Sequence, residues 1–207
     1  MTTRTTRTLF GLAALAITLV ASTDGSAQPR GGKTLDVRVG SVSIEKGKVN
    51  VALLSGEQQG ILPGDKGFFT KNGQKVAGSD FEVSKIGGRV AWTVTSFPTI
   101  DDMRFRTSLT TKVTTPARTC TSKGSKVAVV MSARKETDSS IYFTIDKGTQ
   151  DGVLPSSVLA GPGVGVAELT WVTPNAAGGY VRNVANPDDA ANEFRKTAVE
   201  TFICKTK

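Results

Sequence analysis

The amino-acid sequence predicts a mainly β protein that consists of two tandem copies of a small β-barrel-like unit, each with one short helix. Two observations lead to this fold class. Short apolar segments with strand-like composition alternate with clusters of turn residues along most of the chain. The chain also resembles itself when it is shifted along its own length, which is the signature of an internal repeat.

The self-similarity is clearest at a shift of 92 residues, which places Val49–Pro63 on Ile141–Pro155 without a gap. Two glycines, a glutamine, a leucine and a proline are identical in the two segments. We therefore expect repeat units at residues 34–120 and 121–207, each ending in a strand and a cysteine. The alternative is convergent turn composition in a chain that is rich in strands.

The correspondence extends to both sides once small gaps are allowed. The further matches are 76–83 with 164–171, Gly87-Gly88 with Gly178-Gly179, and 98–106 with 187–195.

Turn residues divide the first unit into six segments. The strands are expected near residues 35–44, 49–54, 66–71, 74–84, 89–96 and 108–115. Asn72-Gly73 predicts a type I′ hairpin turn, because both central residues of that turn need positive φ. Lys46-Gly47 and Gly87-Gly88 mark further turns, and Asp138-Ser139 and Gly178-Gly179 hold the corresponding places in the second unit.

One short helix is expected in each unit. In the second unit Asn186 can cap the helix, and the following Pro187-Asp188-Asp189 suits the first helical turn and its dipole. In the first unit Thr99 is the expected cap, with Asp102 three residues later. Helix capping accounts for these paired aspartates better than catalysis does.

The first 27 residues predict a cleavable signal peptide. Arg4 and Arg7 precede the apolar run Leu9–Ala21, which is too short to cross a bilayer, and small residues lead up to Ala27. Cleavage after Ala27 leaves residues 28–33 as a short flexible leader. The alternative is an uncleaved membrane anchor. No cysteine lies near the cleavage point, so a lipid-modified N-terminus is not expected.

The mature chain is moderately basic, with 24 basic and 17 acidic residues and a formal charge of +7. We expect a periplasmic or extracellular location, no membrane span in the mature protein, and an envelope protein or an anionic polysaccharide as partner. A solvated surface that is merely basic is the alternative. Nucleic acid is not expected, because the chain has no run of five like charges and no basic stretch interleaved with aromatic residues.

The chain contains no histidine, which excludes every catalytic system and metal site that depends on an imidazole. Cys120 and Cys204 are too few for a thiolate metal site and form no redox motif. In an oxidising compartment they are expected to form a disulfide, with two free buried thiols as the alternative. We expect no catalytic residue, no metal and no cofactor.

Two pairs of nearby acidic residues, Asp80 with Glu82 and Asp146 with Asp151, could in principle serve acid–base chemistry or bind calcium. Their spacing matches no calcium-binding loop. The glycine-rich segment Gly161–Gly165 lacks the lysine and hydroxyl residue of a phosphate loop, so a hairpin loop is expected there.

Five aromatic residues lie in or beside predicted strands: Trp92, Phe97, Phe143, Trp171 and Tyr180. A pleated surface buries large rings well, so core packing is the favoured interpretation. A sugar-stacking face is the alternative.

A glycine-rich turn motif links two strands in each unit. Its residues are Gly56, Gly60, Pro63, Gly64 and Asp65 in the first unit and Gly148, Gly152 and Pro155 in the second. Ser156-Ser157 replaces Gly64-Asp65 in the second unit. Glycine suits the tight turns, and the aspartate can accept hydrogen bonds from nearby amides.

The segment Gly60–Phe69 resembles the GD box of cradle-loop β-barrels, which include double-psi and swapped-hairpin barrels. The longer pattern is similar to the duplicated small barrels of bacterial periplasmic envelope proteins, such as the rod-shape-determining protein of the elongation machinery. This resemblance covers about 30 residues of each unit. It implies a fold and a scaffolding or binding role, and it implies no activity.

These observations favour an exported, non-enzymatic binding or scaffolding protein of the bacterial cell envelope. The second hypothesis is a module that binds glycan or peptidoglycan through its basic surface and aromatic residues. The third is a hydrolase that uses two carboxylates, which would have to converge in one cleft.

Overall fold

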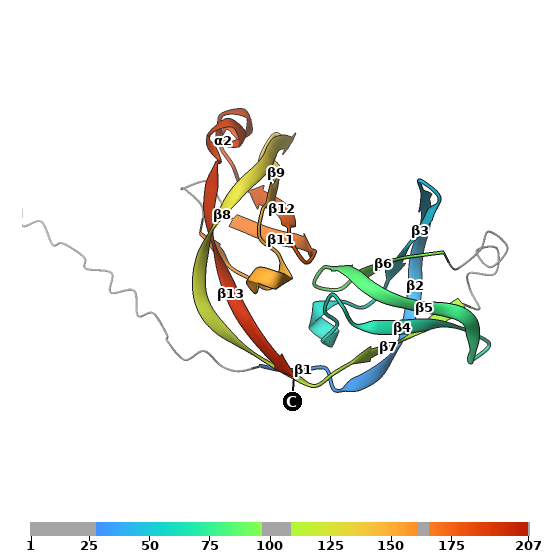
Figure 1. Ribbon diagram of the computed structural model, residues 1–207. Coiled ribbons are helices and arrows are strands. Elements are labelled where there is room, and N and C mark those ends of the chain that lie inside the picture. Colours follow the sequence, from blue (N-terminus) through green and yellow to red (C-terminus); the bar gives the residue numbers. More distant parts are fainter. Residues whose placement is uncertain (1–27, 97–108, 161–165, 207) are drawn as a thin grey trace, which may run out of the picture.

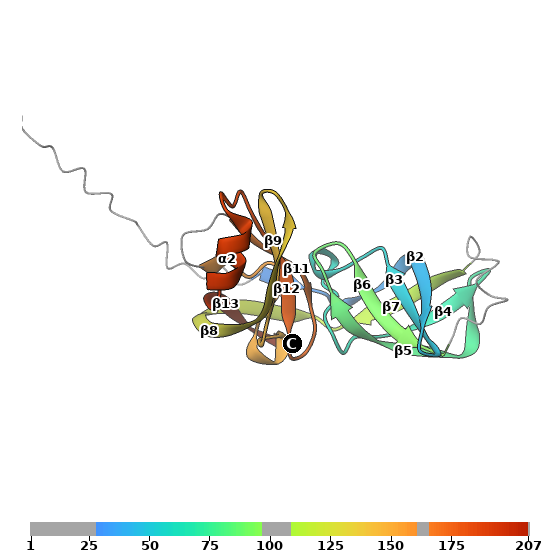
Figure 2. The ribbon, with the colours of Figure 1, turned by 90° about the horizontal axis from the view of Figure 1, so that it is seen from above.

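The computed structural model describes residues 28–96, 109–160 and 166–206, and every structural statement below refers to these residues. The expected signal peptide, Phe97, the first helix with Thr99 and Asp102, and the loop Gly161–Gly165 lie outside the described residues. The described chain is mainly β and forms two lobes that lie side by side (Figures 1 and 2).

The first half is a closed six-stranded barrel. Its strands are β2 (Lys33–Glu45), β3 (Lys48–Leu53), β4 (Lys66–Lys71), β5 (Gln74–Ile86), β6 (Ala91–Thr95) and β7 (Leu109–Thr115), with the 3-10 helix η1 (Glu57–Gln59) after β3. Hydrogen-bonded neighbours follow the order β2-β3-β6-β5-β4-β7, and β7 pairs with β2. These bounds confirm the six predicted strands to within two residues.

The second half has the same strand order. Its elements are β8 (Arg118–Thr137), β9 (Ser140–Ile145), the 3-10 helix η3 (Thr149–Asp151), β10 (Leu159–Ala160), β11 (Val166–Val172), β12 (Ala177–Arg182), the helix α2 (Pro187–Glu193) and β13 (Lys196–Thr206). The order β10-β13-β8-β9-β12-β11 repeats β4-β7-β2-β3-β6-β5. In the described residues β10 and β11 do not pair as β4 and β5 do, so the duplication stays a prediction.

The helix α2 confirms the expectation for the second unit. The side chain of Asn186 accepts a hydrogen bond from the amide of Asp189, and Pro187 occupies the first turn. The helix packs on β8 and β9, on the side of the second half that faces away from the first (Figure 2). Among the described residues, none of the helices has the length and apolar character needed to cross a membrane.

Two predicted turns have a type I′ backbone, which was expected for Asn72-Gly73, whereas Lys46-Gly47 was expected only to be a turn. Lys46 and Gly47 have φ angles of 50° and 75°, and Asn72 and Gly73 have 52° and 81°. Positive φ at both central residues is the requirement of a type I′ turn. The turn expected at Gly178-Gly179 is wrong, because both glycines lie buried inside β12.

The leader and the unit boundary also differ from expectation. Gln28–Arg30 forms a short strand, β1, that pairs with β8, so these residues are not a flexible leader. The expected boundary after Cys120 falls inside β8, which begins at Arg118. Pro116-Ala117 separates β7, the last strand of the first half, from β8, the first long strand of the second half. Cys120 therefore belongs to the first strand of the second half and does not end the first.

Buried and outward-facing side chains alternate along the strands, and the buried ones form the core. In β9 the side chains of Ile141, Phe143 and Ile145 are fully buried, and the residues between them face outwards. Phe143 packs edge to face against Phe194, with ring centroids 5.5 Å apart. Core packing is thus confirmed for Phe143.

Candidate functional site

The two halves meet at the ends of β5 and β11. Ile86 lies opposite Val172 in an antiparallel pair, and each is the last residue of its strand. The two strands hold the same place in the strand order of their halves. We call the contact region between the halves the seam.

The turn motifs of both halves have nearly the same backbone. Gly60 and Gly152 have left-handed φ angles of 88° and 90°, where a side chain would be strained. The amide of Leu62 donates to the Asp65 carboxylate (2.9 Å), and the amide of Leu154 donates to the Ser157 hydroxyl (2.9 Å). A serine thus fills the hydrogen-bonding role of the aspartate in the second half.

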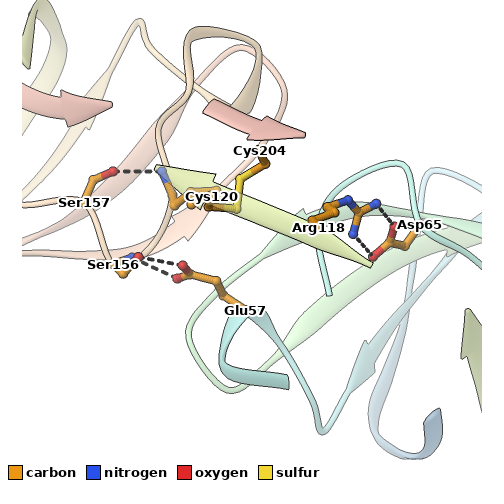
Figure 3. Close-up of a disulfide and its surroundings, with 8 residues drawn as sticks. Glu57, Asp65, Arg118, Cys120, Ser156, Ser157 and Cys204 are labelled. Carbon is orange, nitrogen blue, oxygen red and sulfur yellow. Dashed lines mark hydrogen bonds and ion pairs between the residues drawn. A yellow bond between two sulfur atoms is a disulfide. The ribbon is translucent and has the colours of Figure 1, made fainter. Parts of the chain in front are cut away.

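Acidic side chains from the first turn motif join the halves (Figure 3). Asp65 is 2 % exposed and binds both terminal nitrogens of the Arg118 guanidinium, which comes from the first residue of β8. Glu57 is 4 % exposed and accepts from the amide (2.9 Å) and hydroxyl (2.6 Å) of Ser156. The motif residues therefore hold the seam through buried polar contacts between the halves.

Two β-bulges place side chains on the outer surface beside the seam. The register of β5 shifts between Val83 and Lys85, and that of β11 shifts between Leu169 and Trp171. An extra residue in one strand turns the next side chain to the other face. Lys85 and Trp171 thereby face outwards, at the same place in their respective halves.

These two side chains belong to a continuous row of contacting side chains, four aromatic rings and one lysine, which we call the aromatic strip. Its members are Trp92, Lys85, Trp171, Tyr142 and Tyr180. The Lys85 ammonium lies 4.7 Å from the ring centroid of each tryptophan. The Trp171 indole N–H donates to the Tyr142 hydroxyl (3.0 Å), and the two tyrosine rings meet edge to face at 5.4 Å. All five side chains are partly buried. The strip crosses the seam because Lys85 of the first half contacts Trp171 of the second.

Two arginines flank the far end of the strip. The Arg134 guanidinium lies 5.1 Å from the Tyr142 ring, and that of Arg182 lies 5.4 Å from the Tyr180 ring. Both have acidic neighbours, Glu136 at 3.7 Å and Glu168 at 3.6 Å. These pairs are exposed to solvent and are weak, because water screens them.

Lys85 is different from these arginines. Among the described residues it takes part in no ion pair. Its ammonium lies against the faces of two indole rings, which attract the cation but carry no net charge. Burial lowers the pKa of the Lys85 ammonium below its usual value of 10.5, because a partly buried cation loses hydration.

Gly178 makes room for the strip. A Cβ atom at this position would lie 2.5 Å from Cζ2 of Trp171, so the indole lies directly over the β12 backbone. We expect Gly178→Val to displace Trp171 and to cost about 1–3 kcal/mol of stability through overpacking. Near-ultraviolet circular dichroism and unfolding in denaturant would measure both effects. Ala177→Gly, a conservative change at the buried neighbour, is the control and should leave the indole in place. An unchanged tryptophan signal in Gly178→Val would contradict this account.

The strip revises the sequence interpretation of the aromatic residues. Trp92, Trp171 and Tyr180 lie on the outer face and not in the core. Sequence reasoning missed Lys85 and Tyr142 altogether. Alternation with the apolar residues of β9 could have placed Tyr142 outside. No local signal could have placed Lys85, because its direction depends on the bulge.

Three of the four acidic residues singled out in the sequence have partners of their own. Asp80 pairs with Lys75 (2.8 Å), and Glu82 is exposed on the same face of β5. The Asp146 carboxylate accepts from the amide of Val129 (2.8 Å), whereas Asp151 pairs with Lys126 (3.3 Å). The described residues hold no group of three or more potential metal ligands.

A shallow hollow of about 360 Å³ lies at the β2–β3 hairpin and β6. It contains one carboxylate, Glu45, beside Lys46, Lys48, Asn50 and Val94. A glycosidase needs two carboxylates about 5–10 Å apart, so this hollow does not supply that pair.

The geometry of the strip is thus the main evidence on function. Comparisons of the chain with protein-family models, with curated proteins and with solved structures found no match.

Proposed function

We propose that the mature chain is an exported, non-enzymatic binding or scaffolding protein of the bacterial cell envelope, and that it engages its partner through the aromatic strip. The observation that carries this proposal is the chain of contacts from Trp92 through Lys85 and Trp171 to Tyr142. Partly buried rings with cations among them are typical of binding surfaces, where aromatic and cationic side chains are enriched.

Several features support export and a rigid binding surface. The disulfide between Cys120 and Cys204 suits an oxidising compartment outside the cytoplasm. The ion pair of Asp65 with Arg118 and the hydrogen bonds of Glu57 with Ser156 fasten the two halves to each other. A partner that contacts both halves would therefore meet a preorganised surface, which lowers the entropic cost of binding.

The two halves are proposed to be tandem copies of one unit. The repeated strand order and the matching turn motifs at Gly60 and Gly152 support this. The closed first barrel and the buried Asp65 are also what a relationship to cradle-loop barrels would require. In such a pair the strip would lie at the junction of the copies.

Site-directed crosslinking in the organism that produces the protein tests the binding role. A photoreactive amino acid at Thr144, beside the strip on β9, should form adducts with an envelope component. The same group at Val127, which is 65 % exposed on β8, serves as control. We expect adducts at position 144, fewer of them when Lys85→Gln is added, and none at position 127. Equal labelling at both positions, or no adducts at either, would contradict the proposed function.

A further inference from the structure

We infer that the aromatic strip binds a glycan chain that carries anionic groups, carboxylate or phosphate, and that Lys85 pairs with one of these groups. This inference rests on the proposed function and names its ligand class. It draws on three properties of the strip: its linear extent, the nature of its side chains, and the missing counter-charge at Lys85.

The extent of the strip suits a polymer. Its residues come from β6, β5, β11 and β9, with the fifth, Tyr180, on β12. The row crosses the seam and links both halves by contacts between neighbouring side chains. A row of rings on an outer sheet face offers repeated, similar contacts. Such a surface fits a chain of linked rings better than a compact small molecule, which is normally held in a concave pocket.

The side chains suit sugar rings. An indole or phenol presents a broad apolar surface and a polar edge, and a pyranose presents apolar C–H groups on its faces and hydroxyls around its rim. The tyrosine hydroxyls and the arginines beside them can hydrogen-bond to those rim hydroxyls. The strip thus complements both parts of a sugar.

The position of Lys85 favours an anion on the ligand. The ammonium is held between two indole rings, has no carboxylate partner among the described residues, and is partly removed from water. An anionic group on the ligand would supply the missing counter-charge. Lys75 provides the contrast within the same molecule: its ammonium lies 4.9 Å from the Phe68 ring but is already paired with Asp80.

The protein carries its own reporter for this test. The chain has two tryptophans, and both belong to the strip. Binding to the strip should therefore change the intrinsic tryptophan fluorescence directly. The probes are alginate, whose sugars carry carboxylates, teichoic acid, which carries phosphates, and dextran, which is neutral.

We expect alginate or teichoic acid to bind and to change the fluorescence, with an affinity that falls as salt rises, whereas dextran binds far more weakly. The preference between alginate and teichoic acid identifies the anionic group. Lys85→Gln should weaken binding about tenfold or more, because it removes one charged interaction. Lys75→Gln removes the same charge and a similar ring contact elsewhere, and it should leave binding unchanged.

The pH dependence separates Lys85 from other cations. Because burial lowers its pKa, the Lys85 ammonium loses its proton at a lower pH than an ordinary lysine does, so binding should weaken earlier in the alkaline range. Lys85→Arg keeps a permanent charge, so the part of the decline that Lys85 causes should be absent from this variant. The phenols of Tyr142 and Tyr180 and the guanidiniums of Arg134 and Arg182 are the same in both proteins. A purely structural role for Lys85 would not move this profile.

The outcomes distinguish this inference from the proposed function. Dextran binding as tight as that of the anionic glycans would overturn the role of charge. No binding of any glycan, combined with protein adducts from position 144, would overturn the glycan and leave the binding role intact. Glycan binding that Lys85→Gln and Lys75→Gln weaken equally would place the glycan elsewhere on the basic surface and overturn the assigned site.

Discussion

Reduction of the bond between Cys120 and Cys204 is expected to lower the free energy of unfolding by up to about 4–5 kcal/mol. The bond joins β8 and β13, the first and last strands of the second half, and the two cysteines are directly opposite in the ladder. It closes a loop across 84 residues of sequence separation, and a loop of this length greatly restricts the unfolded chain. A loss of this size is comparable to the total stability of a small domain, about 5–15 kcal/mol.

Equilibrium unfolding in denaturant, with and without reductant, would measure this loss. The double variant Cys120→Ser, Cys204→Ser should reproduce the reduced protein and should not respond to reductant. Because the bond lies entirely within the second half, Trp171 fluorescence in a Trp92→Phe background should report the early loss of structure. Identical midpoints for oxidised and reduced protein would contradict the expectation.

Asp65→Ala is expected to cost about 3–5 kcal/mol, because it leaves a cation without its partner at the seam. The Arg118 side chain is 13 % exposed, so water can hydrate its guanidinium only slightly once the carboxylate is gone. The amide of Leu62 loses its acceptor in the same substitution. Thermal or denaturant unfolding of the purified protein measures the loss.

Two further variants locate the origin of this cost. Asp65→Ser should keep an acceptor for the Leu62 amide, as Ser157 does for Leu154, and so isolates the contribution of the charge. Asp80→Ala breaks an exposed pair, whose side chains are 48 % and 67 % exposed, and should cost less than about 1 kcal/mol. If Asp65→Ala cost no more than Asp80→Ala, the Asp65–Arg118 pair would not hold the seam.

Much of the local structure follows from short stretches of sequence. The type I′ turns at Lys46-Gly47 and Asn72-Gly73 need positive φ, and glycine and asparagine tolerate that conformation. The helix α2 begins where an asparagine and a proline meet the requirements of a helix N-terminus. The strands lie in segments of alternating apolar residues that are bounded by such turns. Each of these features depends on neighbours along the chain, so a short stretch of amino-acid sequence is enough to predict it.

Other features depend on neighbours that are distant in sequence, and here the sequence predictions were wrong or silent. Gly178-Gly179 has the composition of a turn, yet both residues lie in the strand β12, where Gly178 is a glycine because the Trp171 ring lies against it. Cys120 seemed to end the first unit, but its pairing with β13 places it in the second half.

From the amino-acid sequence alone it follows that the protein is mainly β, where most of its strands and turns lie, and that it has no imidazole chemistry. Which side chains form the strip follows only from the folded chain. Lys85 and Trp171 face outwards because a bulge shifts each strand by one residue against its partner, and that shift reverses the face on which a side chain lies. Their meeting at the seam further requires β5 and β11 to come together, 86 residues apart in the chain at Ile86 and Val172. No local pattern encodes that contact, because it arises from the packing of two whole halves.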